Sequence, residues 1–270
     1  MYGAILGDVI GSVFEFDRSP KTKDFQMFSE ESTFTDDSVM TVAVADALTE
    51  IADSGLVKDD DIKEIFVKSM KRWGHKYPWA GYGQRFFMWL NSDYSKPYNS
   101  WGNGSAMRVS PVGWMYETIE ETRRMARLSA EVTHNHPEGI KGAEAIASAI
   151  FLARKGITKE EIKDYIIKEF KYDLSRTCDE IRPDYRHIES CQETVPEAIT
   201  SFLEGESFED VIRTAVSLGG DCDTLTCIAG GMAEAFYGLP CDMKDECIKH
   251  LPGDMFEVVD LFYNRFVKKI

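Results

Sequence analysis

The sequence is poor in basic residues. Of its 270 residues, 31 are lysine or arginine and 46 are aspartate or glutamate, so the formal net charge is −15. Proteins that bind nucleic acid or an anionic membrane surface need a basic face for contacts with phosphate groups. The acidic balance therefore argues against both kinds of partner. An anionic small-molecule substrate is compatible with it only where a local feature offsets the negative charge.

Long apolar runs and an export signal are also missing from the sequence. No stretch approaches the ~20 apolar residues of a membrane span. The N-terminus has no basic segment, and Asp8 interrupts its apolar run, which is atypical of a signal peptide. We therefore expect a cytoplasmic protein without a membrane anchor.

No two cysteines have the CxxC spacing. The six cysteines are scattered along the second half of the chain: Cys178, Cys191, Cys222, Cys227, Cys241 and Cys247. A chain of this size without an export signal is expected to keep them as reduced thiols. His187 and Cys191 are close in sequence, but no second ligand pair accompanies them, so a zinc site is not favoured.

Alternating apolar and polar residues, which would indicate β-strands, are absent as well, and helical periodicity dominates. Apolar residues between 62 and 73 recur at the spacing of an amphipathic helix. Three further segments are apolar on nearly all sides and are typical of buried helices: 39–48, 143–153 and 228–237. The pattern predicts an all-α fold in which residues 1–270 form one domain with buried central helices. The irregular, polar stretch 172–194 is interpreted as a surface excursion.

Two acidic clusters stand among apolar residues. The first is Thr35-Asp36-Asp37, which opens a predicted buried helix. A helix N-cap explains one polar residue at this place, but it does not explain two adjacent carboxylates that run into a buried element. Carboxylates are seldom fully buried unless they are paired or bind a metal ion.

The second acidic cluster is Gly219-Gly220-Asp221-Cys222-Asp223-Thr224, which leads into another predicted buried helix. The two glycines allow backbone conformations that other residues rarely adopt. Asp221 and Asp223 are two residues apart, so in a non-helical turn both carboxylates can point the same way. The spacing resembles half of an EF-hand loop, but the further oxygen ligands of such a calcium loop are missing.

Convergence of the two clusters would gather four aspartates in one place. Like charges so close together cannot all stay ionised without counter-cations. Hard divalent cations take oxygen ligands, and the hydroxyl groups of Thr35 and Thr224 suit them as well. A pair of Mg²⁺ ions would resolve the repulsion and would form a familiar catalytic device.

Three other stretches have an unusual composition. Glycines at positions 3, 7 and 11 share one helix face, which favours close packing against a second helix, and Glu15 follows them. The Gly-rich segment 100–108 could bring backbone N–H groups close to a phosphate, although such a segment is more often only a turn. The segment Thr133-His134-Asn135-His136 is either a pair of transition-metal ligands or an ordinary polar loop.

In this order, the segments resemble the ADP-ribosylglycohydrolase family, which includes the dinitrogenase-reductase-activating glycohydrolases. The resemblance spans nearly the whole chain, and its most specific part is Gly-Gly-Asp-x-Asp-Thr with an upstream Thr-Asp-Asp. The matching residues are Gly7-Asp8, Gly11-Ser12, Glu15, Thr35-Asp36-Asp37, Gly102-Asn103-Gly104, Met107-Arg108, Thr133-His134 and the stretch from Pro196 to Gly238.

The resemblance implies an all-helical protein that holds two Mg²⁺ ions, or Mn²⁺ in their place, at the base of an ADP-ribose cleft. By resemblance, the metal ligands are Thr35, Asp36, Asp37, Asp221, Asp223 and Thr224. The substrate contacts that it implies are Gly102, Asn103, Gly104, Ser105, Met107, His134 and Gly220. Glu15 falls where family members carry a mobile acidic residue, and Glu15 and Asp36 are our candidates for proton transfer in catalysis.

These assignments also account for the local charge. Glu15 and the four aspartates contribute −5, and two divalent ions would contribute +4, so a diphosphate substrate would enter a nearly balanced site. Cys222, between two of these aspartates, departs from the family pattern and could make the site sensitive to thiol oxidation. Glu234 is unexpected in a helix of small residues.

We therefore expect hydrolysis of the glycosidic bond between ADP-ribose and a modified acceptor, with release of ADP-ribose. One alternative is a metal-dependent phosphohydrolase that cleaves the diphosphate of a nucleotide and releases AMP. Another is a non-catalytic ADP-ribose-binding relative, although a pure binder has no need of so many repelling carboxylates. Arginine, serine, a nucleobase and a small ester all stay open as the acceptor, and a monomer is the expected oligomeric state.

Overall fold

The computed structural model describes residues 1–94 and 96–268, and within these ranges it contains helices and loops but no β-strand. The prediction of an all-α fold is confirmed. The α-helices are α1 (Tyr2–Gly11), α2 (Asp36–Ser54), α3 (Asp59–Lys76), α4 (Gln84–Leu90), α5 (Gly104–Met107), α6 (Ser110–Met115), α7 (Ile119–Glu131), α8 (Pro137–Arg154), α9 (Lys159–Phe170), α10 (Cys178–Ile181), α11 (Cys191–Glu204), α12 (Phe208–Leu218), α13 (Cys222–Tyr237), α14 (Cys241–Lys249) and α15 (Gly253–Phe262). A 3-10 turn, Ser12–Phe14, follows α1, and a π-helical turn, Tyr263–Val267, follows α15.

The centre of the fold is the contact between α1 and α13. The glycines of α1 lie against the backbone of α13: a Cβ atom on Gly3 would come within 2.4 Å of the carbonyl oxygen of Gly230, and one on Gly7 within 2.2 Å of that of Thr226. A Cβ atom on Gly11 would lie 2.6 Å from the Cα atom of Asp223. The close approach predicted from the glycine spacing is therefore present, and it brings the end of α1 to the start of α13.

The three helices predicted to be buried are found as parts of α2, α8 and α13. Each helix begins several residues before the apolar segment that the sequence pattern marked out, at 36, 137 and 222 instead of 39, 143 and 228. The added first turns of α2 and α13 are largely buried and include polar residues, among them Asp37 and Asp223, whereas that of α8 is only partly buried. The apolar pattern therefore predicted where the helices lie but not their polar first turns, and the first turns of α2 and α13 contribute to the site described below.

Glu234 has a structural explanation. Its carboxylate is buried in α13, where it accepts a hydrogen bond from the backbone N–H of Gly3 at 2.8 Å and contacts the buried amino group of Met1. The first turn of a helix leaves backbone N–H groups without partners inside the helix, and a carboxylate is a favourable partner for them. Glu234 therefore fastens the start of α1 to α13.

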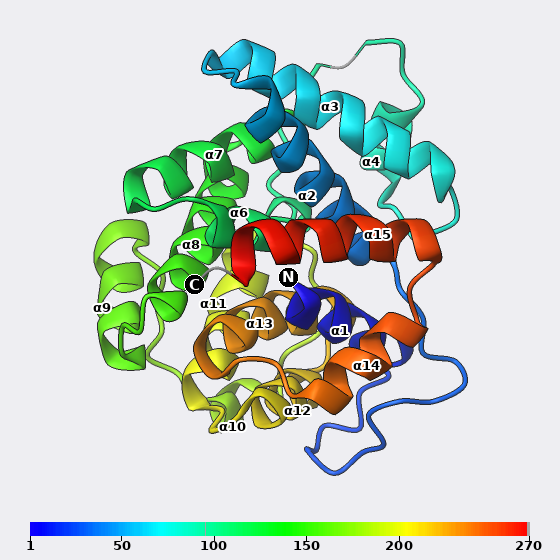
Figure 1. The fold of residues 1–270 in the computed structure, drawn as a ribbon. Helices are drawn as coiled ribbons and strands as arrows, with labels where there is room; N and C mark the ends of the chain where they lie inside the picture. Colours follow the sequence, from blue (N-terminus) through cyan, green and yellow to red (C-terminus); the bar gives the residue numbers. More distant parts are fainter. Residues whose placement is uncertain (95, 269–270) are drawn as a thin grey trace.

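Further helices surround this centre, as Figure 1 shows. Helix α3 packs along α2, α7 along α8 and α12 along α13, while α14 contacts α1 and α15 contacts α2. The predicted apolar stripe of α3 faces inward, and its buried residues are Ile62, Ile65, Phe66, Ser69, Met70 and Trp73. These helices join in one hydrophobic core that contains residues from Met1 to Val267.

The stretch 172–194 is only partly a surface excursion. Tyr172, Leu174, Ile181 and Tyr185 are buried, so that interpretation was wrong for its apolar half. The irregular spacing of these side chains matches neither a helix nor a strand, which is why the sequence pattern did not show them as buried. The segment packs beside the second acidic cluster, because the ring of Tyr185 lies against Gly220.

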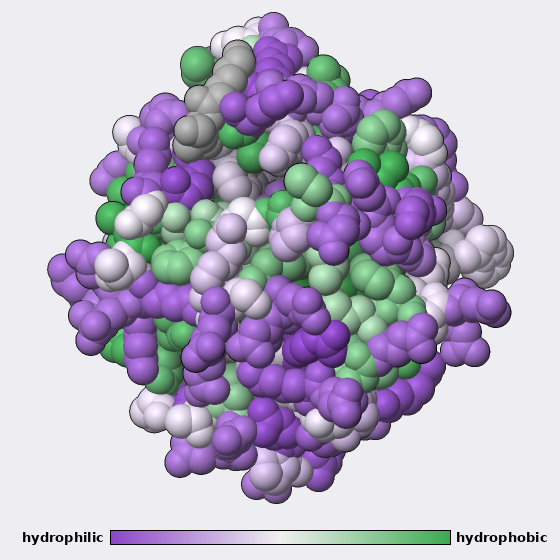
Figure 2. Space-filling view, turned by 60° about the horizontal axis from the view of Figure 1, so that its bottom comes forward, coloured by the Kyte–Doolittle hydropathy of each residue, from purple (hydrophilic) through white to green (hydrophobic). Residues whose placement is uncertain are grey.

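Figure 2 shows one face of the molecule, on which hydrophilic residues predominate and smaller hydrophobic areas lie between them. Among the described residues, no helix has both the length and the apolar character needed to cross a membrane.

The packing of α1 on α13 leads to a prediction. Replacing Gly7 by alanine places a Cβ atom 2.2 Å from a backbone oxygen that cannot rotate away, so α1 and α13 must move apart. We expect Gly7→Ala to lower the free energy of unfolding by about 1–3 kcal/mol despite the higher helix propensity of alanine. Urea denaturation followed by circular dichroism measures this change.

Gly253→Ala is the matched control, since Gly253 lies in the first turn of α15 and a Cβ atom there meets no neighbour within 4 Å. Its free energy of unfolding should be unchanged or slightly higher. Equal stability of the two variants would contradict close packing at Gly7.

Candidate active site

The two acidic clusters meet where α2 and α13 begin. The hydroxyl group of Thr224 donates a hydrogen bond of 3.1 Å to Oδ2 of Asp37. Carboxylate oxygens of Asp8, Asp37 and Asp223 all lie within 4.8 Å of one another, and the three side chains are buried. The convergence considered from the sequence is therefore present, with Asp8 as a further member.

Asp8 organises the start of α2. Its carboxylate accepts hydrogen bonds from the backbone N–H of Thr35 at 2.9 Å, the hydroxyl group of Thr35 at 2.6 Å and the backbone N–H of Ser38 at 3.0 Å. The Ser38 hydroxyl group donates to it as well. Thr35 is the N-cap of α2 and accepts the N–H of Asp37 at 3.3 Å, as the capping interpretation of this residue requires. Asp8 was not among the predicted site residues; its signal was a lone carboxylate in an otherwise apolar helix.

The second cluster is shaped by its two glycines. Gly219 and Gly220 have φ angles of +74° and +76°, which L-residues with a side chain rarely adopt. A Cβ atom on Gly220 would also lie 2.6 Å from the ring of Tyr185. Both glycines are thus needed to turn the chain from the end of α12 to Asp221, the N-cap residue of α13.

The Gly-rich segment is attached to this turn. The side-chain amide of Asn103 donates hydrogen bonds to Oδ2 of Asp221 at 2.6 Å and to the hydroxyl group of Thr194 at 3.1 Å. The backbone N–H of Asn103 donates to the carbonyl oxygen of Glu189 at 2.9 Å. Asn103 therefore fixes the position of the loop relative to the second acidic cluster.

A cavity of about 440 Å³ extends from the aspartates along this loop. Most predicted site residues line it: Glu15, Asp36, Asp37, Gly102, Asn103, Gly104, Met107, His134, Asp221, Asp223 and Thr224. Ser105 and Gly220 do not line it, because Ser105 is buried with its hydroxyl group on the carbonyl oxygen of Gly139 and Gly220 packs on Tyr185. Thr35 lies beside it, with its hydroxyl group on Asp8.

Several lining residues were not predicted as site residues. They include Arg85, Tyr98, Arg108 and Glu189. Arg108 is buried, donates to the backbone oxygen of Ser129 at 3.0 Å and to the hydroxyl group of Thr133 at 2.8 Å, and has no partner for its Nε atom. Burial lowers the pKa of Arg108 to about 10, so the group stays cationic at neutral pH. In the sequence, Arg108 was indicated only by the Met107-Arg108 pair among the residues that match the family.

His134 is held as a neutral imidazole beside the Gly-rich loop. Burial, and then the charges of Arg108 and Arg85, keeps the pKa of His134 well below its ordinary value. Its Nδ1 atom lies 2.7 Å from the hydroxyl oxygen of Thr133, which already accepts a hydrogen bond from Arg108. The Thr133 hydroxyl group can donate to Nδ1, and in that tautomer Nε2 carries the proton on the side of Gly104.

The second histidine of this segment points elsewhere. His136 is the N-cap of α8, and its Nδ1 atom accepts the backbone N–H of Glu138 at 3.2 Å. The two imidazoles thus have separate tasks, which fits an ordinary polar loop and not a pair of ligands for one transition metal. His187 and Cys191 are also separate, since His187 contacts Glu189 and the thiol of Cys191 donates to the carbonyl oxygen of Gly102 at 3.1 Å.

Glu15 reaches the cavity from a long loop that is fixed to α12. The Ser19 hydroxyl group donates to the carbonyl oxygen of Val216 at 2.6 Å. The Lys21 ammonium group donates to the carbonyl oxygens of Tyr185 at 2.9 Å and Leu218 at 2.5 Å. These contacts hold the loop next to the turn that carries Asp221.

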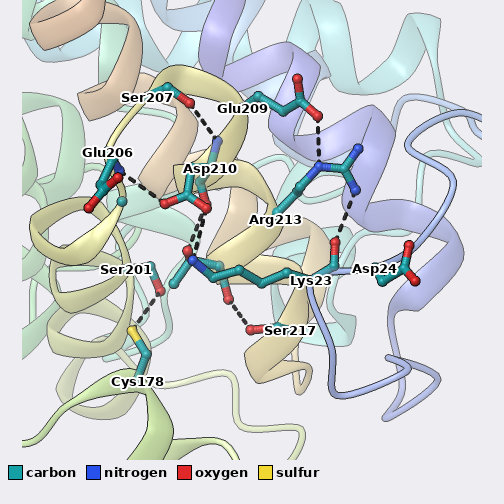
Figure 3. A network of polar contacts seen from close by, with 12 residues as sticks. Lys23, Asp24, Cys178, Ser201, Glu206, Ser207, Glu209, Asp210, Arg213 and Ser217 are labelled. Atoms are coloured by element: carbon teal, nitrogen blue, oxygen red, sulfur yellow. Dashed lines mark hydrogen bonds and ion pairs between the residues drawn. The ribbon is translucent and has the colours of Figure 1, made fainter.

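Figure 3 shows the outer part of this attachment. Lys23 forms an ion pair of 2.9 Å with Asp210 of α12, and Arg213 donates to the carbonyl oxygen of Lys23 at 3.0 Å while its Nε atom pairs with Glu209 at 2.7 Å. Arg213 also donates to the carbonyl oxygen of Phe25 at 2.9 Å. The Glu15 loop is therefore held in place by its contacts with α12.

At the acidic end of the cavity, neighbouring carboxylates repel one another and are shielded from water. Burial, followed by the charge of Asp223, raises the pKa of Asp36 and of Asp37 well above their ordinary range. Burial, followed by the charge of Asp221, does the same to the pKa of Asp223. Burial raises the pKa of Asp221 and of Glu15 to about 7. Such a group of carboxylates binds protons or cations more readily than isolated aspartates do.

Cys222 does not belong to the acidic surface of the site. Its buried thiol group lies 3.9 Å from the carbonyl oxygen of Val216 and 3.9 Å from the hydroxyl group of Thr226, on the core side of α13. Burial raises the pKa of this thiol, so it stays protonated, and thiols react with oxidants as thiolates. The burial of this thiol does not favour the expected sensitivity to oxidation through Cys222, which stays a prediction.

The raised pKa values predict how pH affects the metal-free protein. A carboxyl group whose pKa is about 7 in the folded state and about 4 in the unfolded chain holds more protons when folded across that interval. Raising the pH from about 4 to about 7 therefore favours unfolding through this group. We expect the melting temperature in EDTA to fall over this interval relative to a variant that lacks the group, Asp221→Asn.

Thermal melts of both proteins in EDTA, and of the wild type with added Mg²⁺, measure this effect. Added Mg²⁺ should flatten the pH dependence of the wild type. Identical pH profiles of the wild type and Asp221→Asn in EDTA would contradict the assignment of a raised pKa to Asp221.

Comparison with known proteins identifies the group to which this chain is related. The family model described as ADP-ribosylglycohydrolase matches residues 1–269. The chain is 28% identical to ADP-ribosylhydrolase ARH3 of Gallus gallus, over 91% of this chain and 87% of that protein. It is also 28% identical to ADP-ribosylhydrolase ARH3 of Homo sapiens, over 88% of this chain and 84% of that protein.

A solved structure described as an ADP-ribosylglycohydrolase-related protein complex has the same fold, with a TM-score of 0.72 and 20% sequence identity. The superposition covers 97% of this chain and 94% of that chain. Because the family model covers nearly every residue, and its characteristic motifs meet in one cavity, this chain belongs to the ADP-ribosylglycohydrolase family.

Proposed function

We propose that the protein is a metal-dependent hydrolase that cleaves the glycosidic bond between ADP-ribose and a modified acceptor. Membership of the family supports a hydrolase that acts on ADP-ribosyl linkages, and the relatives in chicken and human are named ADP-ribosylhydrolases. The observation that carries the proposal is a cavity with two unlike ends. One end gathers carboxylates from distant parts of the chain, and the other holds a Gly-rich loop, a neutral histidine and a buried arginine.

The residues at the acidic end fit divalent cations that prefer oxygen ligands. Oδ1 of Asp37 is buried and has no hydrogen-bond partner, so it has a free lone pair inside the site. Asp8 accepts the hydroxyl proton of Thr35, and the N–H of Asp37 donates to the same hydroxyl oxygen, so one lone pair of this oxygen stays available. Two Mg²⁺ ions, or Mn²⁺ in their place, would be held by Thr35, Asp36, Asp37, Asp221, Asp223 and Thr224. Bound there, they would offset the carboxylate charge and lower the pKa of a coordinated water.

Glu15 and Asp36 are proposed to move protons during the reaction. The pKa of Glu15 is about 7, so near neutral pH this carboxyl group can both release and accept a proton. The Asp36 carboxylate lines the cavity next to Gly81, and no side chain of another described residue donates a hydrogen bond to it. Both carboxyl groups therefore face the space in which a substrate or a water molecule would lie, and Asp36 would combine this role with that of a metal ligand.

The opposite end of the cavity is proposed to hold the nucleotide part of ADP-ribose. Gly102 and Gly104 have no side chain to cover His134: a Cβ atom on Gly104 would come 3.2 Å from its Nε2 atom. The Nε2–H group can then donate a hydrogen bond to a ribose or phosphate oxygen. Arg108 and Arg85 add positive charge on this side, which favours a diphosphate.

In the proposed reaction, the bond between C1 of the terminal ribose and the acceptor atom breaks. The acceptor leaves with the electron pair and takes up a proton, while a water oxygen bonds to the same carbon and loses a proton. The sugar carries positive charge as the acceptor departs, and the surrounding carboxylates stabilise it. The pH–rate profiles of Glu15 and Asp36 variants distinguish the proton donor from the proton acceptor.

The decisive experiment is a product analysis. The protein is incubated with arginine- and serine-ADP-ribosylated peptides, and with ADP-ribose itself, in Mg²⁺ or in EDTA, and the products are identified by mass spectrometry. We expect ADP-ribose and the unmodified peptide, formed only with the metal. Release of AMP would favour the phosphohydrolase, and tight binding of ADP-ribose without any product would favour the non-catalytic binder.

Asp223→Asn provides the matching mutational prediction. Loss of one proposed ligand should reduce kcat/KM at least about 100-fold. Mutation of residues that only hydrogen-bond to metal ligands already lowers metal affinity or activity about 10–100-fold. The variant should remain folded, since it removes one of several repelling charges from a buried cluster. Activity assays, metal binding by calorimetry and circular dichroism measure the three properties.

Asp60→Asn, at an exposed carboxylate in the first turn of α3, is the control and should keep full activity. A fully active Asp223→Asn enzyme with unchanged metal affinity would contradict the assignment of Asp223 as a metal ligand.

A further inference from the structure

A second, smaller cavity adjoins the first. Its volume is about 260 Å³, and Glu15 and Gly81 line both cavities. The second cavity contains no residue of the Gly-rich loop and neither His134 nor Arg108; its other walls include Arg18, Glu31, Thr33 and Trp79. It therefore begins at the acidic end of the main cavity and leads away from the end proposed to hold the nucleotide.

Trp79 is the outstanding feature of this cavity. Its side chain is 93% exposed, the highest value among the large hydrophobic residues in the described ranges. An exposed indole leaves a large apolar area in contact with water. Exposed tryptophan side chains are typical anchors of protein–protein contacts, because binding buries this area. No other described part of the chain covers this side chain.

The backbone holds Trp79 in a defined place relative to the acidic cluster. The carbonyl oxygen of the next residue, Ala80, accepts the backbone N–H of Asp36 at 2.7 Å, and the N–H of Ala80 donates to the carbonyl oxygen of Tyr77 at 3.3 Å. The Tyr77 hydroxyl group in turn donates to Asp254 of α15 at 2.6 Å. Trp79 thus stands on a short segment that is fixed to the first residue of α2.

The charges of the second cavity do not suit a second nucleotide. Its carboxylates are Glu15 and Glu31, and its one cationic lining residue is Arg18, whose guanidinium group lies 5.5 Å from the centre of the Phe16 ring. Two carboxylates against one arginine repel a polyphosphate. Opposite charges beside the hydroxyl group of Thr33 are compatible with the mixed polar groups of a peptide.

The exposure of Trp79 also indicates how large the occupant is. A small alcohol or an isolated amino acid could fill the 260 Å³ between Glu15 and Gly81, but a side chain that is 93% exposed is covered only by a ligand that continues over the surface. A polypeptide that enters the cavity through one modified side chain continues in this way on both sides of that residue.

We propose that the second cavity is the acceptor subsite and that it binds the polypeptide around an ADP-ribosylated side chain. Trp79, which lines the cavity and is exposed to solvent, is the main contact for the residues that flank the modified side chain. This inference rests on the proposed function, because an acceptor subsite has meaning only where ADP-ribose is removed from an acceptor. Trp79 is then a specificity residue: it distinguishes a modified protein from a small ADP-ribosyl conjugate.

The test compares two substrates with the same ADP-ribosyl linkage. One is a peptide of ten residues with a single modified side chain, and the other is the same modified amino acid with blocked amino and carboxyl groups. Steady-state kinetics with Mg²⁺ are measured for the wild type and for Trp79→Ala, Trp79→Phe and Tyr94→Ala. Tyr94 is the control, because its side chain is 77% exposed and lines neither cavity.

We expect Trp79→Ala to raise KM for the peptide about tenfold with kcat within twofold, which is the signature of lost binding that ground and transition states share. Its kinetics on the blocked amino acid should equal those of the wild type. Trp79→Phe, which keeps an aromatic face, should recover most of the affinity for the peptide, and Tyr94→Ala should change neither substrate.

Equal kinetic constants of Trp79→Ala and the wild type on the peptide would overturn the subsite, and so would equal losses on both substrates. Failure of the wild type to release ADP-ribose from either substrate would instead overturn the proposed function, on which the subsite depends. The two failures are therefore distinguished by the wild-type reaction alone.

Discussion

The mutual repulsion of buried carboxylates is the constraint around which this fold is organised. Asp8, Asp37 and Asp223 place their oxygens within 4.8 Å of one another inside a protein core, an arrangement that stays unfavourable without bound cations. The remaining structure partly compensates for it. Asp37 and Asp223 lie in the first turns of α2 and α13, where the positive ends of the helix dipoles favour negative charge. Asp8 is satisfied by four hydrogen bonds from Thr35 and Ser38, so its charge stabilises the start of α2 at the same time.

That arrangement depends on apolar packing elsewhere. Asp8 lies in α1, which packs so closely on α13 that Gly7 and Gly11 have no room for a Cβ atom, and from there it contacts the start of α2. The glycines therefore contribute to the site although they touch no ligand. The charge of the cavity also changes along its length, from the aspartates to the neutral His134 and the cationic Arg108. A protein with a net charge of −15 can thus present a favourable surface to a diphosphate, because the local charge of the cavity and not the total charge decides.

The sequence allowed the helices and most of the site to be predicted, for reasons that also explain the failures. Buried helices carry a periodic apolar pattern, so α2, α8 and α13 were recognisable, whereas their polar first turns were not part of that pattern. Asp36 and Asp221 stood out as acids among apolar residues. Asp8 stood out equally, but only tertiary packing shows that it caps α2. Glu189 lies in an irregular segment whose apolar residues have no helical or strand periodicity. Trp79 lies in a short segment that is placed next to the site by a backbone hydrogen bond between Ala80 and Asp36, which the sequence does not indicate.

The Glu15 loop is attached to the turn at Gly219 and Gly220 by a side-chain contact. Residues 15 and 221 are far apart in the chain, so their relative position depends on tertiary contacts. Lys21 bridges them, because its ammonium group binds the carbonyl oxygen of Leu218, where α12 ends, and that of Tyr185, whose ring packs on Gly220. A cation at the end of a helix is favoured by the helix dipole, so this contact stabilises α12 as well. Lys21 therefore helps to set the position of Glu15 relative to Asp221, together with Ser19 and Lys23, which also contact α12. A displacement of the turn would move the acidic end of the cavity and the Glu15 loop together.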